Sequence, residues 1–89
     1  MRYYTRKDVV TIVGCDEGFV ISLEQEEVIA VDAPGDAEGL YSEQMLERIR
    51  VARNLIHDLE VNLAGAAIIV RMREEIADLQ RELARRVRD

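Results

Sequence analysis

Apolar side chains recur at helical spacing near the start of the chain. A first helix is predicted over 6–13, because Thr5 and Asp8 have the spacing of a capping box and Gly14 can end the helix. Its apolar face consists of Val9, Ile12 and Val13. A second helix is expected to start after Asp16, which can cap it. Its inward side chains are Phe19, Val20 and Leu23. Two short helices joined by a tight turn with glycine predict a helix-turn-helix.

The segment after the second helix has the pattern of a small hairpin. Residues 28–31 are β-prone, residues 34–36 read Pro-Gly-Asp, which is a turn signal, and residues 40–41 can form a short return strand. This hairpin, or wing, is one interpretation of the segment. An irregular loop is the other.

From Ser42 onward the helical signal is strong. Ser42 can cap a helix over 43–60, in which apolar residues step by four, three, four and three. This single apolar stripe consists of Met45, Ile49, Ala52, Ile56 and Leu59. Three basic residues of the same helix lie mostly off the stripe: Arg48, Arg50 and Arg53.

A last helix is predicted over 63–89, with Asn62 as its cap. Its apolar residues are spaced three, four, three and four, and Gly65 lies one step upstream on the same face. This heptad seam consists of Ile69, Met72, Ile76, Leu79 and Leu83. A helix of about 25 residues spans about 37 Å, which is too long for the rest of so small a domain to cover. The seam is therefore expected to be a dimer interface with a second copy, parallel or antiparallel. Packing back onto helix 43–60 is the alternative.

Together these elements predict a mainly α fold, with a helix-turn-helix, a small wing and a long C-terminal helix. The chain is one domain, with a winged helix-turn-helix part over 1–61 and a dimerisation helix over 62–89. A chain of 89 residues has a limited core, and oligomerisation is a common way for so small a chain to gain stability.

Few residues could support catalysis or hold a metal. His57 is the only histidine and Cys15 the only cysteine, so the sequence offers no metal-ligand spacing and no intramolecular disulfide. His57 is interpreted as a surface or interface residue and Cys15 as a small buried hydrophobe; a catalytic histidine and a redox thiol are the weaker alternatives. We expect no enzyme activity, no metal and no cofactor.

The sequence also indicates the cellular compartment of the protein. The N-terminus lacks the apolar run of a signal peptide, and no segment approaches the ~20 apolar residues of a membrane span. A lone cysteine fits a reducing compartment. A cytoplasmic protein that does not bind membranes is therefore expected.

Charge is unevenly distributed along the chain. Residues 1–41 hold three basic and nine acidic residues, whereas residues 42–89 hold nine of each, so the net charge of −6 lies in the first half. Five carboxylates cluster on and around the second predicted helix: Asp16, Glu17, Glu24, Glu26 and Glu27. They are candidate contacts for a basic partner. A solvated acidic face is the alternative, and the arginines of helix 43–60 form a rival surface.

The order of helix-turn-helix, hairpin, "GLYSEQMLERI" and long helix resembles the MerR family of regulators. The stretch 50–83, "RVARNLIHDLEVNLAGAAIIVRMREEIADLQREL", resembles the MerR-like chaperone modulators called CbpM. Its marks are a His-Asp-Leu helix end, a glycine near the start of the final helix, and the pattern Met-x-x-acid-Ile-x-x-Leu from Met72 to Leu79.

This resemblance implies a small, helical, dimeric protein without catalytic residues. CbpM-type proteins bind the J-domain of CbpA, a DnaJ-like co-chaperone that also binds curved DNA, and they inhibit both its co-chaperone activity and its DNA binding. J-domains characteristically carry a basic second helix, so an acidic surface would complement them.

The alternative function is that of a MerR-like DNA-binding transcriptional regulator. Such proteins commonly have an arginine midway along the second helix and another before the Leu-Tyr of the wing. Here the nearest positions hold Ile21 and Gly39, and no basic residue occurs between Lys7 and Arg48. Phosphate contacts supply most of the non-specific affinity for DNA and need Lys or Arg, so direct DNA binding is not expected.

Overall fold

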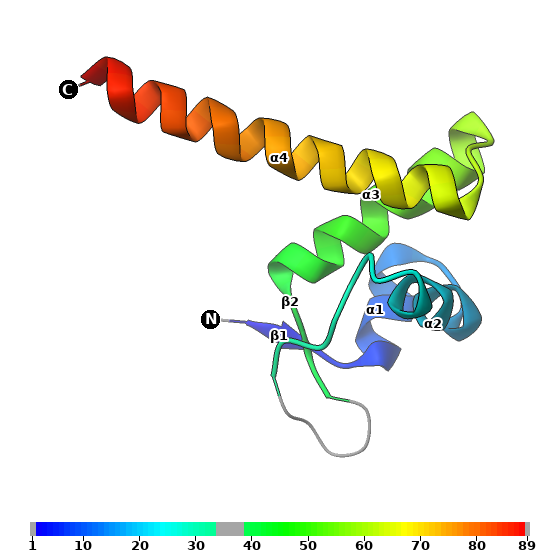
Figure 1. Cartoon of the computed structure of the whole chain (residues 1–89). Helices are drawn as coiled ribbons and strands as arrows, with labels where there is room; N and C mark the ends of the chain where they lie inside the picture. The colour runs from blue at the N-terminus through cyan, green and yellow to red at the C-terminus, as the bar shows by residue number, and fades with distance from the viewer. Residues whose placement is uncertain (1, 34–38, 89) are drawn as a thin grey trace.

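The computed structural model describes residues 2–33 and 39–88, and in this part the fold is mainly helical, as predicted. The elements in chain order are β1 (Tyr3–Tyr4), α1 (Arg6–Val13), α2 (Glu17–Gln25), β2 (Tyr41–Ser42), α3 (Glu43–Leu59) and α4 (Leu63–Arg88). Figure 1 shows α1 and α2 close together below the crossing of α3 and α4, with the C-terminal end of α4 extending far from them.

Helix boundaries follow the caps that the sequence predicts. Thr5 and Asp8 form the capping box of α1, and Gly14 ends that helix in a left-handed conformation with φ 77°. Asp16 caps α2 by accepting a hydrogen bond from the Phe19 amide at 2.8 Å. Two further caps accept hydrogen bonds in the same way: Ser42 from the Met45 amide, and Asn62 from the Gly65 amide.

The wing differs from the predicted hairpin. Residues 28–31 form no strand. In the described part of the wing the two arms meet in an isolated antiparallel bridge between Ala33 and Leu40, and the Ser42 amide donates to the Asp32 carboxylate at 3.0 Å. Val28 and Ile29 are buried in the core instead, so their apolar character reflects packing rather than sheet formation. The wing is therefore present as predicted, but residues 28–31 are not one of its strands. The Pro-Gly-Asp turn lies outside the described residues.

The return strand does exist, but it has another partner. Tyr41 and Ser42 of β2 pair antiparallel with Tyr4 and Tyr3 of β1, from the opposite end of the domain. Sequence reasoning gave β2 a neighbour nearby in the chain, whereas pairing with the N-terminus anchors β1 beside α3 (Figure 1).

The core lies between α3 and the N-terminal helices. Its largest fully buried side chains are Tyr41, Leu23, Ile49, Val9 and Val20. The predicted stripe of α3 is correct at Met45, Ile49 and Ala52, which are buried, but wrong at Leu59, which is 68% exposed. Leu46 is buried in addition, because elements packed on both sides of α3 make its buried face wider than one stripe. Leu59 occupies the last position of α3, before Glu60 turns the chain with φ 54°.

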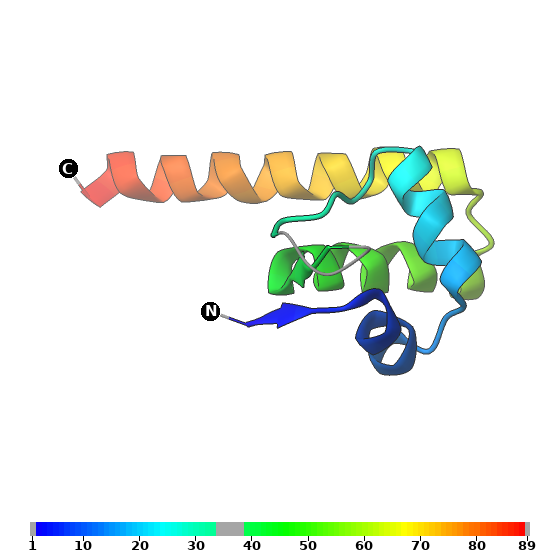
Figure 2. The same cartoon turned by 90° about the horizontal axis from the view of Figure 1, so that it is seen from below.

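α4 buries apolar side chains against α3 in its first turns, and the Arg48–Glu74 contact joins the two helices further along. Ala66, Ala67 and Val70 are buried there, and Figure 2 shows α4 running beside α3 and then continuing well past it. A helix of 26 residues is about 39 Å long. The length and exposure of α4 agree with the long C-terminal helix that the sequence predicts.

Candidate functional site

The five candidate carboxylates around α2 lie in different environments. Asp16 is the N-cap of α2, so one of its oxygens is engaged by the helix itself. This carboxylate stabilises the free amides at the start of α2. It is therefore a structural residue of the helix-turn-helix, whatever else it contacts.

Glu17 and Glu24 face back toward α1. The Arg6 guanidinium lies 3.6 Å from a carboxylate oxygen of each, and its side chain is only 16% exposed. The buried Tyr41 hydroxyl donates a hydrogen bond to Glu24. Burial and this hydrogen bond raise the pKa of Tyr41, so the phenol stays protonated and keeps donating. Glu24 thus links α2 to α1 and β2, and Arg6 offsets its charge.

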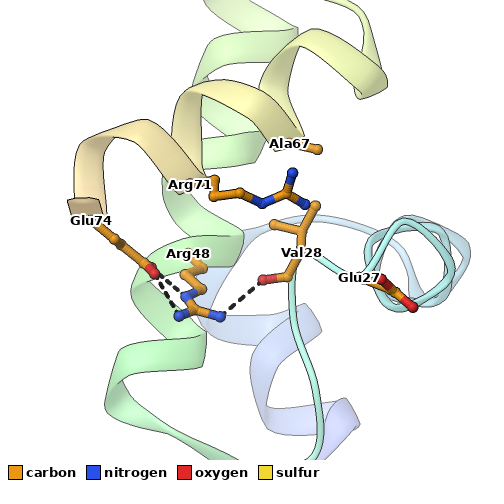
Figure 3. Close-up of a pocket in the computed structure, with 6 residues that line it drawn as sticks. All are labelled: Glu27, Val28, Arg48, Ala67, Arg71 and Glu74. Atoms are coloured by element: carbon orange, nitrogen blue, oxygen red, sulfur yellow. Dashed lines mark hydrogen bonds and ion pairs between the residues drawn. The ribbon is translucent and has the colours of Figure 1, made fainter. Parts of the chain in front are cut away.

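Glu26 and Glu27 remain at the C-terminal end of α2. Both side chains are exposed, and in the part of the chain that the structure describes neither forms an ion pair. Glu27 has a left-handed backbone with φ 59°, which turns the chain out of the helix toward Val28. We call these two neighbouring carboxylates the Glu26–Glu27 edge. Glu27 also lines the pocket that the Arg48 and Arg71 side chains line (Figure 3).

The outward face of α2 carries no charge. Gly18, Ile21 and Gln25 are exposed along it, and the Ser22 hydroxyl donates back to the Gly18 carbonyl at 2.9 Å. In a helix-turn-helix this is the face that would read DNA. The sequence indicated an acidic second helix, but its acidity lies on the side toward Arg6 and at its end. The outward face itself is small and neutral.

The wing also lacks room for the arginine of a DNA-binding relative. Gly39 has φ 81°, and a Cβ built there would lie 2.2 Å from a methyl carbon of Val31 and 3.2 Å from the Ala33 carbonyl oxygen. Any side chain at this position would be strained and would clash. The glycine is therefore required by the reduced wing, and a basic residue cannot replace it without rearranging the loop.

The arginines of α3, which form the alternative basic surface, mostly contact other residues of the same chain. Arg48 binds both carboxylate oxygens of Glu74 on α4 and donates to the Val28 carbonyl at 3.2 Å. Figure 3 shows this guanidinium between the two, at a pocket of about 120 Å³ that Arg71 and Ala67 also line. Arg48 thereby connects α3, α4 and the segment after α2. Arg50 contacts Glu47 at 3.3 Å, and Arg53 contacts Asn54 at 3.4 Å.

The candidate chemical residues do not form a reactive centre. Burial, with a smaller contribution from the Asp16 carboxylate, raises the pKa of the Cys15 thiol, which disfavours the nucleophilic thiolate. His57 is exposed and contacts Asp58 at 3.4 Å. Across residues 2–33 and 39–88, no three His, Cys, Asp or Glu side chains gather in a metal-binding arrangement. In the same part, no helix combines the length and apolar character that a bilayer span requires.

The seam residues of α4 form a second candidate surface. Met72, Ile76, Leu79 and Leu83 are all between 51% and 64% exposed, and Ile69 is half-buried. Among the described residues, no other element of the chain covers the four exposed side chains. This apolar strip is available to a partner, while Ala66, Ala67 and Val70 on another side of the same helix bind α3.

Two short helices with a tight turn, a reduced wing and a long final helix define the class of winged helix-turn-helix proteins. The chain belongs to the MerR helix-turn-helix family of regulatory proteins, whose family model matches residues 4–87. Searches of curated proteins and of solved structures give no significant match. The family match includes all but the last residue of α4, so α4 belongs to the family's unit as much as the helix-turn-helix does.

Proposed function

We propose that this protein is a non-enzymatic modulator that binds the J-domain of a CbpA-like or DnaJ-like co-chaperone. The observation that carries the proposal is the Glu26–Glu27 edge, two exposed carboxylates that form no ion pair among the described residues, at the end of the helix that DNA-binding relatives use for recognition. The resemblance of residues 50–83 to CbpM-type proteins points to the same partner.

Electrostatics favour a basic protein over DNA as the ligand. A duplex carries one negative charge per ~1.7 Å of its axis, and binding it requires Lys or Arg near the phosphates. The outward face of α2 is neutral, its end is acidic, and the wing position at Gly39 excludes a side chain. A basic helix of a J-domain would meet no such repulsion, and complementary charge would speed its encounter with the edge.

Inhibition in this proposal is steric. A modulator that covers the basic surface of the J-domain prevents that surface from meeting its Hsp70 partner. It also covers cations with which the co-chaperone would bind DNA. No chemical step is required, which fits a chain whose cysteine is disfavoured as a thiolate and whose histidine lies at the surface.

Isothermal titration calorimetry with the CbpA-like J-domain of the same organism tests the proposal at low and moderate salt. We expect binding at micromolar concentrations or tighter. The double variant Glu26→Gln/Glu27→Gln should weaken it by up to about thirtyfold at low salt and by less at high salt, since exposed ion pairs contribute up to ~1 kcal/mol each and are screened. Absence of binding at micromolar concentrations would refute the proposal.

A matched control is the double variant Asp58→Asn/Glu60→Gln. It removes the same two negative charges from the exposed end of α3, away from the Glu26–Glu27 edge, and should leave the affinity for the J-domain within about twofold of the wild type. Equal losses in both double variants would mean that net charge, and not the edge, determines binding.

The second candidate function is that of a MerR-like DNA-binding transcriptional regulator, which membership of a regulatory family favours. Specific binding to a promoter fragment, measured by fluorescence anisotropy and falling steeply with salt, would support it. The neutral face of α2 and the glycine of the wing predict no such binding.

A further inference from the structure

A pocket beside the Glu26–Glu27 edge joins three parts of the fold. Glu27 lines it from the segment after α2, Arg48 from α3 and Arg71 from α4, as Figure 3 shows. Glu74 of α4 lines it as well. Two guanidinium groups and two carboxylates therefore meet next to the surface that the proposed function assigns to the J-domain.

The charges of Arg48 and Glu74 are already used within the chain. The Arg48 guanidinium donates to both carboxylate oxygens of Glu74, through Nε and through Nη2, the latter at 2.5 Å. Its Nη1 donates to the Val28 carbonyl oxygen at 3.2 Å. All three nitrogens of this guanidinium have a partner, and its charge is offset by an anion of the same chain. This pair offers little to a ligand from outside.

Arg71 is in the opposite situation. Its side chain is exposed, and in the described part of the chain it forms no hydrogen bond and no ion pair. Figure 3 shows its guanidinium extending toward Val28, while Glu74, one turn further along α4, is bound to Arg48. Glu27 lines the same pocket without pairing with Arg71. A positive charge with a planar set of N–H donors thus remains available beside the Glu26–Glu27 edge.

The surface around this pocket is therefore mixed in sign. Glu26 and Glu27 attract a basic group of a partner, whereas Arg71 repels the same group when it comes close. A uniformly basic partner surface would be stabilised at the edge and destabilised at Arg71. A surface that carries a carboxylate next to its basic residues would be stabilised at both places.

We propose that Arg71 is a specificity-determining residue of the partner contact and binds a carboxylate that lies beside the basic residues meeting the Glu26–Glu27 edge. This role of Arg71 rests on the proposed J-domain function and adds a second charge to the pattern that the J-domain must present. A guanidinium binds a carboxylate through two parallel hydrogen bonds, which fix the orientation of the partner as well as its affinity.

The apolar lining of the pocket strengthens such a pair. Val28 and Ala67 lie in the same pocket and are only 4% and 7% exposed. Apolar side chains on one side of an ion pair reduce the water around it, so the pair is screened less than one on an open surface. A carboxylate bound by Arg71 here is expected to contribute more than an ordinary exposed ion pair.

The sign of the effect of Arg71→Gln on binding tests the proposal. Isothermal titration calorimetry with the CbpA-like J-domain at low salt should show affinity weakened about three- to tenfold, because a bound carboxylate loses its cation. Arg71→Lys keeps the charge and should bind the J-domain more tightly than Arg71→Gln does. The Arg71 side chain is exposed and contacts no described residue through a hydrogen bond or ion pair, so both variants should keep the fold.

Arg85→Gln is the matched control. It removes the same charge from another exposed arginine of α4, which lies outside the pocket and has no ion pair among the described residues. Affinity for the J-domain should stay within about twofold of the wild type. Equal weakening by Arg85→Gln and Arg71→Gln would overturn the proposal, because the effect would then come from the net charge of α4.

Two results for Arg71→Gln itself would overturn the proposal. Tighter binding would mean that Arg71 repels a uniformly basic surface or masks Glu27 in the free protein. Unchanged affinity would mean that no charged group of the partner lies near Arg71. In both cases the J-domain function would stand, whereas a wild-type protein that does not bind the J-domain would refute that function and this role of Arg71 together.

A double-mutant cycle identifies the carboxylate of the partner. The exposed Asp and Glu residues of the J-domain are neutralised one at a time, and each variant is titrated with the wild-type protein and with Arg71→Gln. One substitution should weaken binding to the wild type as much as Arg71→Gln does, and should have no further effect on binding to Arg71→Gln. Additive effects for every carboxylate would show that none of them pairs with Arg71, and would overturn the proposal.

Discussion

The two halves of α4 belong to one uninterrupted helix but interact with their surroundings in opposite ways. The first half contacts α3 through Ala66, Ala67 and Val70, which are buried. The second half carries larger apolar residues, such as Leu79 and Leu83, and leaves them exposed, as the side of the first half that faces away from α3 does with Met72. Small side chains allow two helix axes to approach closely, whereas a longer stripe of large ones is typical of an interface between chains. Residue size, more than hydrophobicity, separates the face that folds the monomer from the face left for a partner.

The largest expected effect comes from introducing an aspartate into each half of α4 and comparing the two variants. Ala66→Asp puts a carboxylate at a fully buried position between α3 and α4, and should destabilise the fold by more than about 4 kcal/mol, enough to unfold so small a domain. Ile76→Asp, at a position 51% exposed, should keep the helical fold but convert the dimer that the seam predicts to monomer. Circular dichroism during denaturation measures the first effect and light scattering the second.

Two results would contradict this difference between the two halves of α4. If Ile76→Asp lost its helical signal together with Ala66→Asp, the second half would be part of the folding unit. If Ile76→Asp kept the mass of a dimer, the seam would have no role in pairing. Ile76→Ala serves as a milder control, since it shortens the side chain without adding a charge.

The sequence predicted the local features of the fold more closely than the non-local ones. The caps at Thr5, Asp16, Ser42 and Asn62 are all correct, because a cap depends on residues within one helical turn. The pairing of β1 with β2 joins residues almost 40 positions apart and has no short-range signal. For the same reason the β-prone residues 28–31 suggest a strand, although Val28 and Ile29 are buried in the core and Val31 is exposed.

The candidate site shows a similar division. The sequence identified five carboxylates, but it could not show that Arg6 and Tyr41 engage Glu17 and Glu24, because these partners come from α1 and β2. Only the tertiary structure separates the carboxylates that hold the helices together from the Glu26–Glu27 edge. The signal available in the sequence was a basic residue, Arg6, preceding an acidic helix, and spacing alone did not indicate the contact.

A medium effect is expected at Glu74, where the packed half of α4 ends. This carboxylate receives two hydrogen bonds from Arg48, and the two side chains are 34% and 24% exposed. Glu74→Ala leaves the Arg48 guanidinium partly buried without its anion, which should lower the free energy of unfolding by about 1–2 kcal/mol, between the values for surface and buried pairs.

Glu75→Ala is the matched control for this prediction. It removes the next carboxylate along the same helix, which is exposed, and should change the stability of the monomer by less than ~0.5 kcal/mol. Urea denaturation of both variants in an Ile76→Asp background separates effects on the fold from effects on pairing. Equal stability of the two variants would show that Arg48 does not hold α4 in place.

The smallest effect is expected one turn further along, at Asp78. This carboxylate forms an ion pair with Arg81, as Glu74 does with Arg48, but both side chains are more than 70% exposed. Water and salt screen such a pair, so Asp78→Ala should alter the free energy of unfolding of the monomer by no more than ~0.5 kcal/mol. Urea denaturation in the Ile76→Asp background measures the difference. A loss as large as that of Glu74→Ala would mean that the second half contributes to the monomer fold, and the division between the two halves of α4 would disappear.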